Sequence, residues 1–473
     1  MMSARRWTRW RQVLTRDWYS SRRLTWGAAT VLLSALVTLA YYANQPGVLR
    51  DPDPDTRGYV AVAHAIVQRG QLVDPLRLPG YPLFMVGVFA LAGSDNLAAV
   101  SVAQGLLFVL AAGELYVLLC LAGMPSWRAG VAAMLAGTNV HLLSYVYPPL
   151  TEGLALCQIV SLALVVTLFL RRPRVWTLWV IAALTLALFM TRPEWIYLPV
   201  PLFAYLLFIA WRRGALRRLL PHALVAVLAL YGFLGLYVRA NQAVTGCACL
   251  TSVQSINLLG KVMQYRMQDE APPRYADMTR LVDSFLARGD DDPWNVIRAN
   301  YPLLNRNFSA LAGEYSTAII TAHPLEYLAK SLPLVAQLLT DTTPFRPLAR
   351  QRAFWPLLLA LDGLSRLAFV ALLALFPLGA LSWWWRLRRA TADDHLLVET
   401  MAALALLAAY GLALSALGGY IYYPRLHTPY APLLLAVGWG ALLGLLPRRA
   451  GTRSVERRAA APVISRRAGA SYD

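Results

Sequence analysis

About ten apolar stretches of roughly 20 residues run through this chain, and each is long enough to cross a lipid bilayer as a helix. A spanning helix satisfies its own backbone hydrogen bonds, so a chain built of such stretches is confined to a helical membrane fold. The composition agrees, since 58% of the residues are apolar and only 15% are charged. We therefore predict an all-α polytopic membrane protein. The predicted spans are 24–43, 97–121, 129–147, 150–170, 175–191, 194–211, 219–239, 363–385, 396–417 and 426–446.

The net charge of +19 is collected at the ends of the apolar stretches, which is typical of membrane topology and argues against a nucleic-acid partner. Ten passes place both termini on one side, and arginines concentrate there, so this side is expected to be cytoplasmic. The basic arm (1–23) and the basic tail (447–473) would then meet anionic lipid head groups. The internal arginine-rich turns fall on the same side: Arg171, Arg172, Arg174, Arg212, Arg213, Arg217, Arg218, Arg386, Arg388 and Arg389.

Two segments are left on the opposite, extracytoplasmic side. A first loop (44–79) belongs to a membrane module (24–239), and a large loop (240–352) precedes the C-terminal spans (353–446). Periodicity in the large loop predicts juxtamembrane helices near 253–268, 274–288 and 294–321. The short apolar stretch 80–93 is predicted to be juxtamembrane or re-entrant, because a full span there would move every later arginine run outside.

The cysteines indicate little chemistry. Cys120 and Cys157 lie in predicted spans, where a thiol is usually a small apolar filler. Cys247 and Cys249 begin the large loop and are either a local disulfide or an unbonded pair, and without a nearby histidine pair they do not predict a zinc site.

The first loop opens on the acidic run Asp51-Pro52-Asp53-Pro54-Asp55. A carboxylate held by prolines beside the membrane is suited to act as a catalytic base that faces a lipid-borne substrate. We predict Asp55 as this base, with Asp53 as its rival. The alternative is a solvated loop or a cap for the following helix.

Three arginines are candidates to bind a phosphate of such a substrate. Arg77, Arg192 and Arg425 each lie at an outer membrane boundary, where a guanidinium can bind phosphate through two hydrogen bonds, although arginines at helix ends also reach to the interface for solvation alone. Glu152 begins a span on the same face and either assists the base or only complements the helix dipole. His427 either donates a further hydrogen bond to the phosphate or is a packing residue.

With these residues placed, the chain resembles the GT-C superfamily of integral-membrane glycosyltransferases. The resemblance is carried by an aspartate with a tyrosine four residues later (Asp55, Tyr59) and by a proline-rich entry to the next helix, Arg77-Leu78-Pro79-Gly80-Tyr81-Pro82. Further outer turns agree in order and side: Tyr147-Pro148-Pro149-Leu150-Thr151-Glu152, Thr191-Arg192-Pro193-Glu194 and Tyr423-Pro424-Arg425-Leu426-His427-Thr428-Pro429.

The resemblance is greatest to bacterial aminoarabinose transferases and protein O-mannosyltransferases. It implies a catalytic site in the first outer loop of a bacterial inner-membrane protein, facing the periplasm or cell exterior, with Tyr59 and Tyr81 shaping the substrate pocket. The aminoarabinose branch has an acid–lysine pair where this chain has Leu76-Arg77-Leu78, which argues against that donor and removes one candidate metal ligand. We predict no required metal or other cofactor, while a divalent ion stays open.

The expected activity is inverting single displacement of a sugar from a polyprenyl-phosphate donor to a hydroxyl of a glycan, lipid or protein. The expected partners are this lipid-linked donor, the acceptor and membrane lipids. Glu114 lies within a predicted span, as a proton path would require, so a transporter or flippase of a lipid-linked molecule is the rival interpretation. A noncatalytic scaffold is a third.

Overall fold

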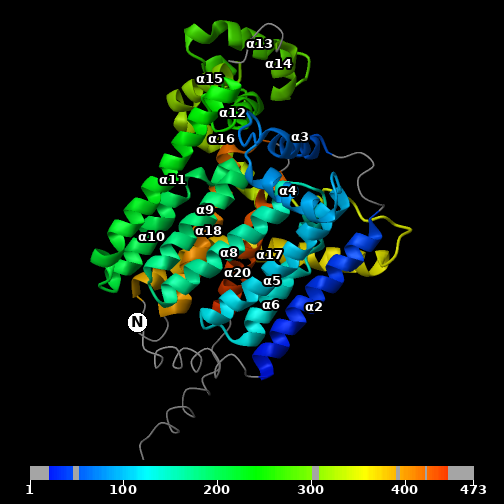
Figure 1. Ribbon diagram of the computed structural model, residues 1–473, viewed down its shortest axis with the longest axis vertical. Helices are drawn as coiled ribbons and strands as arrows, with labels where there is room; N and C mark the ends of the chain where they lie inside the picture. The colour runs from blue at the N-terminus through cyan, green and yellow to red at the C-terminus, as the bar shows by residue number, and fades with distance from the viewer. Residues whose placement is uncertain (1–20, 46–52, 301–307, 390–394, 421–422, 446–473) are drawn as a thin grey trace, which may run out of the picture.

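The computed structural model of the chain describes residues 21–45, 53–300, 308–389, 395–420 and 423–445. Every regular element within these residues is a helix (Figure 1). Most of the predicted basic arm, the predicted tail and residues 46–52 of the first loop lie outside the described part of the chain.

The described residues include eight helical segments long and apolar enough to cross a membrane, and the protein is a multi-pass membrane protein. A ninth span arises if α6 (Ser126–Gly137) and α7 (Val140–Val146), which are bent by 51°, are taken together. The eight are α2 (Ser21–Asn44), α5 (Leu97–Leu121), α8 (Thr151–Arg171), η1 (Pro193–Tyr197) with α10 (Pro199–Arg212), α11 (Leu216–Thr245), α17 (Trp355–Arg389), α18 (His395–Gly418), and α19 (Tyr423–His427) with η4 (Thr428–Tyr430) and α20 (Ala431–Leu445).

Two apolar helices are shorter. The predicted span 175–191 is α9 (Val175–Thr191), with 17 residues. The stretch predicted to be re-entrant is α4 (Gly80–Ala92), whose 13 residues extend about 20 Å at 1.5 Å per residue, less than the roughly 30 Å of a hydrocarbon core. Each predicted span therefore coincides with an apolar helix, and α4 is too short to change the side on which later turns emerge.

The arginine-rich turns gather at one end of the bundle. Arg213 pairs with Glu399 and donates to the carbonyl of Leu170, while Arg212 donates to the carbonyl of Leu387 over 2.8 Å. These contacts join the ends of α8, α10 and α17 to the start of α18, at the lower end of the bundle in Figure 1. The basic residues that predict a cytoplasmic side are thus neighbours in space.

The two outer loops form helices at the other end. The first loop contains α3 (Pro54–Arg69), which lies across the upper ends of the spans in Figure 1. The large loop begins with a Cys247–Cys249 disulfide and is tied to the first loop, because Ser252 donates its backbone N–H to the carbonyl of Pro75 over 2.8 Å. Its helices are α12 (Val253–Gln264), α13 (Ala276–Leu286), α14 (Pro293–Asn300), α15 (Phe308–Ala322) and α16 (Pro324–Thr340).

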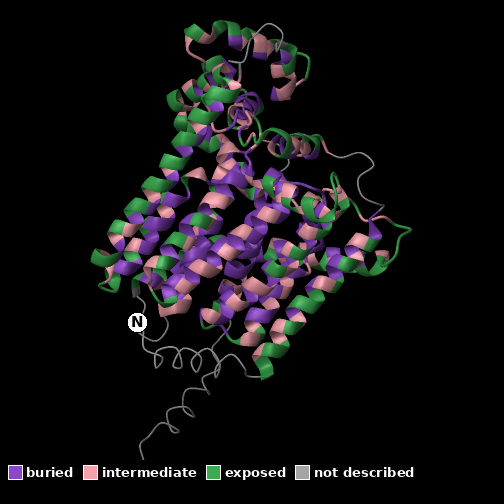
Figure 2. Cartoon of the chain, viewed as in Figure 1, coloured by how far each residue is buried: buried purple, intermediate pink, exposed green. Residues whose placement is uncertain are grey.

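Burial separates inner from outer spans (Figure 2). α8, α18 and the last span are mostly buried, whereas α2, α11 and α17 keep one face uncovered. The uncovered faces carry leucines such as Leu36, Leu228 and Leu381. Apolar side chains on the rim of a helical bundle are suited to lipid, so these faces need no protein partner.

Candidate active site

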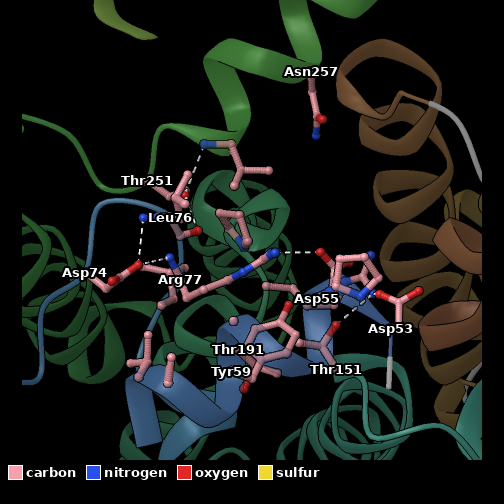
Figure 3. A pocket seen from close by; sticks show the side chains of 18 of the residues that line it. Asp53, Asp55, Tyr59, Asp74, Leu76, Arg77, Thr151, Thr191, Thr251 and Asn257 are labelled. Carbon is pink, nitrogen blue, oxygen red and sulfur yellow. Dashed lines mark hydrogen bonds and ion pairs between the residues drawn. The ribbon is translucent and has the colours of Figure 1, made fainter. Parts of the chain in front are cut away.

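A cavity of about 840 Å³ opens at the upper end of the bundle. Its walls come from α3, from the loop 71–78, from the outer ends of α8 and α9, from α12 and from the start of α19. Figure 3 shows Asp55 and Arg77 joined across this cavity, with Asn257 reaching in from α12. Both outer loops and the ends of α8, α9 and the last span therefore contribute to one site.

Asp55 occupies the centre of a network of ion pairs. Its Oδ1 accepts from a terminal nitrogen of Arg77 at 2.5 Å, and its Oδ2 accepts from Arg425 at 2.7 Å. These two arginines lie 348 residues apart in the sequence, on opposite sides of nearly all the spans, and the fold brings them to the two oxygens of one carboxylate. Asp55 is partly exposed toward the cavity, so it remains accessible to a substrate.

Glu152 continues the network below the cavity. Its Oε1 accepts from Arg425 Nε at 2.5 Å and from Arg192 at 2.8 Å, and its side chain is fully buried. Arg192 also donates to Glu194 over 2.5 Å and to the Thr151 hydroxyl over 3.3 Å. The three predicted arginines and two of the three predicted carboxylates thus form one connected cluster, in which Glu152 holds two arginines in place.

Asp53 has a different position from Asp55. Its side chain caps α3 by accepting from the backbone N–H of Asp55 over 2.8 Å, and Pro54 follows at the first position of the helix. This is the cap that the sequence left open as an alternative. Asp53 also lines the cavity, but its side chain bonds to the backbone of the helix and not to an arginine.

The position of Arg77 is set by an aspartate and two glycines around it. Asp74 accepts the backbone N–H of Arg77 over 2.7 Å, which holds the turn before α4. Gly58 on α3 leaves room for the guanidinium, because a Cβ there would lie 3.2 Å from Arg77 Nε. Gly80 lets the start of α4 approach α9, since a Cβ there would lie 2.6 Å from the backbone carbonyl of Met190.

The two predicted substrate-shaping tyrosines lie at different depths. Tyr59 lines the cavity, and the guanidinium carbon of Arg77 lies 4.8 Å from its ring centroid. Tyr81 is fully buried beneath it, with the two ring centroids 4.9 Å apart, and donates to Gln104 over 2.8 Å. Tyr81 therefore supports the site from below and does not belong to the cavity wall.

His427 lies outside the cluster and the cavity lining, so its predicted contact with the donor phosphate does not fit its position. The side chain is fully buried, with Nδ1 2.7 Å from the carbonyl oxygen of Leu338 and Nε2 3.1 Å from Nε2 of His141. It is one helical turn or less from Arg425, but the ring points into the bundle. This matches the packing role that the sequence analysis kept as the alternative.

The two arginines dominate the electrostatics of Asp55. Burial by itself would raise the pKa of this carboxyl, but Arg425 and Arg77 outweigh burial and hold the pKa at about 2. Asp55 is therefore an ion-paired carboxylate over the physiological range. Among the described residues, no group of three or more histidines, cysteines and carboxylates is placed to hold a metal ion.

Two supporting residues were not predicted. Glu194 pairs with Arg192, and its place two residues after that arginine was the available signal. Gln104 is buried about two turns from the start of α5 and donates to the carbonyls of Val146 and Leu150, over 3.0 Å each, which fixes the turn before Glu152. Nothing in the sequence pattern distinguishes this glutamine from an incidental polar residue in a span.

Two acidic residues within the spans have polar partners. Glu114 accepts from the Ser161 hydroxyl over 2.7 Å, and Asp362 pairs with Arg366 on the next turn at 2.8 Å.

No protein-family model matches the sequence, and no curated protein matches it. Solved structures do: the apo form of the Archaeoglobus fulgidus oligosaccharyltransferase has a TM-score of 0.50 at 11% identity, covering 89% of this chain and 51% of that one. The same archaeal enzyme tethered to an acceptor peptide gives a TM-score of 0.47 at 12% identity, covering 89% and 50%. The first likeness shows a shared fold, and the chain spans about half the length of the structures that it matches.

Proposed function

We propose that the protein is a membrane glycosyltransferase of the GT-C type, which moves a sugar from a polyprenyl-phosphate donor to a hydroxyl acceptor with inversion. The observation that carries this proposal is the meeting of Asp55 with Arg77 and Arg425 in one cavity, with Glu152 and Arg192 behind them. A carboxylate beside guanidiniums is the combination that sugar transfer from a phosphate requires.

In the proposed reaction the acceptor oxygen attacks the anomeric carbon of the sugar from the side opposite the phosphate. Asp55 accepts the hydroxyl proton, the new bond from carbon to acceptor oxygen forms, and the bond from carbon to phosphate oxygen breaks. The leaving polyprenyl phosphate keeps the electron pair, and Arg77 and Arg425 stabilise its added negative charge. One displacement inverts the configuration at the anomeric carbon.

The proposed location of the site is the extracytoplasmic face of a bacterial inner membrane. It is supported by the position of the cavity at the end of the bundle opposite the arginine-rich turns, since such turns favour the cytoplasmic side. A lipid-linked donor suits this face, because its isoprenoid tail lies in the membrane while the phosphate reaches the level of the cavity.

The test compares cells that have the wild-type protein, no protein, or Asp55→Asn, by mass spectrometry of envelope glycans, lipids and glycoproteins. We expect one sugar mass to be lost without the protein and with Asp55→Asn, because loss of a general base lowers the rate by about 10²- to 10⁴-fold. Asp277→Asn is the matched control, since Asp277 forms an exposed pair with Arg280 far from the cavity. Full modification in the Asp55→Asn cells would contradict the proposal.

The same proteins in detergent separate an enzyme from a flippase. A detergent micelle has no two sides, so a protein that only moves a lipid-linked sugar across a bilayer transfers nothing there. We expect the purified wild-type protein to join the sugar identified in cells to its acceptor under these conditions.

A further inference from the structure

The cavity has no surplus of positive charge with which to receive a phosphate. Its lining includes five arginines and five carboxylates. Within the central cluster, three guanidiniums (Arg77, Arg192, Arg425) are already paired with three carboxylates (Asp55, Glu152, Glu194). An anionic ligand can bind well only if it takes over partners that a carboxylate now holds.

Asp55 is the carboxylate placed to give way. Both of its oxygens are occupied by arginines that line the cavity, and its side chain is 28% exposed. Glu152, in contrast, is 0% exposed and lies beneath the cavity, where a ligand does not reach it. Exchange with an incoming anion is therefore expected at Asp55, while Glu152 keeps Arg425 in position.

We propose that the donor phosphate and Asp55 compete for the guanidiniums of Arg77 and Arg425, so that donor binding itself releases Asp55 to act as the base. This inference rests on the proposed function and adds to it that donor binding regulates the base. A donor that carries one phosphodiester charge replaces one carboxylate as the partner of the two arginines. Without a donor, Asp55 stays paired.

The acid–base chemistry supports the order of events. A carboxylate with a pKa of about 2 accepts a proton from a hydroxyl poorly. When the arginines turn to the phosphate, burial is left as the main influence and raises the pKa of Asp55, which makes it a stronger base. After transfer, Asp55 gives its proton to solvent and pairs with the arginines again as the polyprenyl phosphate leaves.

The test measures binding of a short-chain polyprenyl methyl phosphodiester to the full-length protein in nanodiscs. This probe carries the single diester charge of the donor and does not titrate near neutral pH. Because Asp55→Asn removes the competing charge, we expect this variant to bind the probe more tightly than wild type, by on the order of tenfold, although it transfers no sugar. Asp53→Asn is the matched control, since it removes one charge at the cavity edge without freeing an arginine, and we expect less than about a twofold change.

A second measurement needs no variant that must fold. Calorimetry in buffers of different ionisation enthalpy counts the protons taken up when the probe binds. We expect wild type to take up a fraction of a proton on binding at about pH 5 and none by about pH 8.

The outcomes are distinguishable. Sugar transfer and probe binding by wild type, with no tighter binding by Asp55→Asn and no proton uptake, would refute the exchange alone. A wild-type protein that neither binds the probe nor transfers sugar would overturn the proposed function as well.

Discussion

Replacing Arg425 by lysine tests whether the geometry of the cluster matters beyond its charge. Arg425 donates from Nε to Glu152 over 2.5 Å and from a terminal nitrogen to Asp55 over 2.7 Å, so its planar fork spans two carboxylates. A lysine ammonium is a single point on a flexible stem and does not hold both carboxylates in that geometry. The variant keeps the charge and loses one of the two bonds.

The expected loss of activity in Arg425→Lys follows from the missing hydrogen bond. A hydrogen bond to a charged group contributes about 2 kcal/mol, and the Arg425 side chain is only 15% exposed, so solvent screening is small. If the bond also holds the arginine for the transition state, kcat/KM falls by about 30-fold. The assay is initial-rate sugar transfer by purified protein over a range of donor concentrations, with thermal unfolding measured in parallel.

Arg213→Lys is the control, because Arg213 pairs with buried Glu399 at the opposite end of the bundle. We expect this variant to lower the unfolding temperature and to leave kcat/KM unchanged. If Arg425→Lys transfers sugar with wild-type kcat/KM, then a positive charge suffices and the two-carboxylate geometry is irrelevant to transfer.

Two further predictions concern stability. The folded-state pKa of Asp55 is about 2 against 3.8 for an unperturbed carboxyl, so its pairing contributes about 2 kcal/mol above about pH 4, which is lost as the pH falls toward 2. The unfolding temperature of wild type should therefore exceed that of Asp55→Asn at pH 6, and a difference that persists at the lowest pH would contradict the ion-pair account. Gly80→Ala should destabilise the protein by about 1–3 kcal/mol through the clash with Met190. Gly87→Ala is the control on the same helix, because nothing lies within 4 Å of a Cβ there. Equal unfolding temperatures of the two variants would refute the clash.

The sequence was sufficient for the apolar helices and for the gathering of the arginine-rich turns at one end of the bundle. The length and hydropathy of a continuous stretch identify a span. The arginines that flank a span lie next to it in the sequence, so they can be located in the same way. The prediction that α4 does not cross the membrane also rested on the length of one stretch. Because α4 is short, Arg77 lies at the same end of the bundle as Glu152 and Arg192. The identity of five members of the cluster could thus be predicted from their place at outer boundaries: Asp55, Glu152, Arg77, Arg192 and Arg425.

Contacts between these residues depend on how the helices are rotated about their axes. Arg425 and His427 begin the same span, yet one reaches Asp55 and the other faces His141, and no boundary rule separates them. Asp53 and Asp55 share one acidic run, but the first turn of α3 directs one to the helix backbone and the other to the arginines.

Hydropathy and charge therefore determined that this chain is a multi-pass helical membrane protein with polar outer turns. Only the tertiary structure decided which of those polar residues meet, because packing at glycines such as Gly80 and bonds from buried groups such as Gln104 set the rotation and depth of each helix. Those interactions join residues far apart in the chain, and a local pattern carries no record of them.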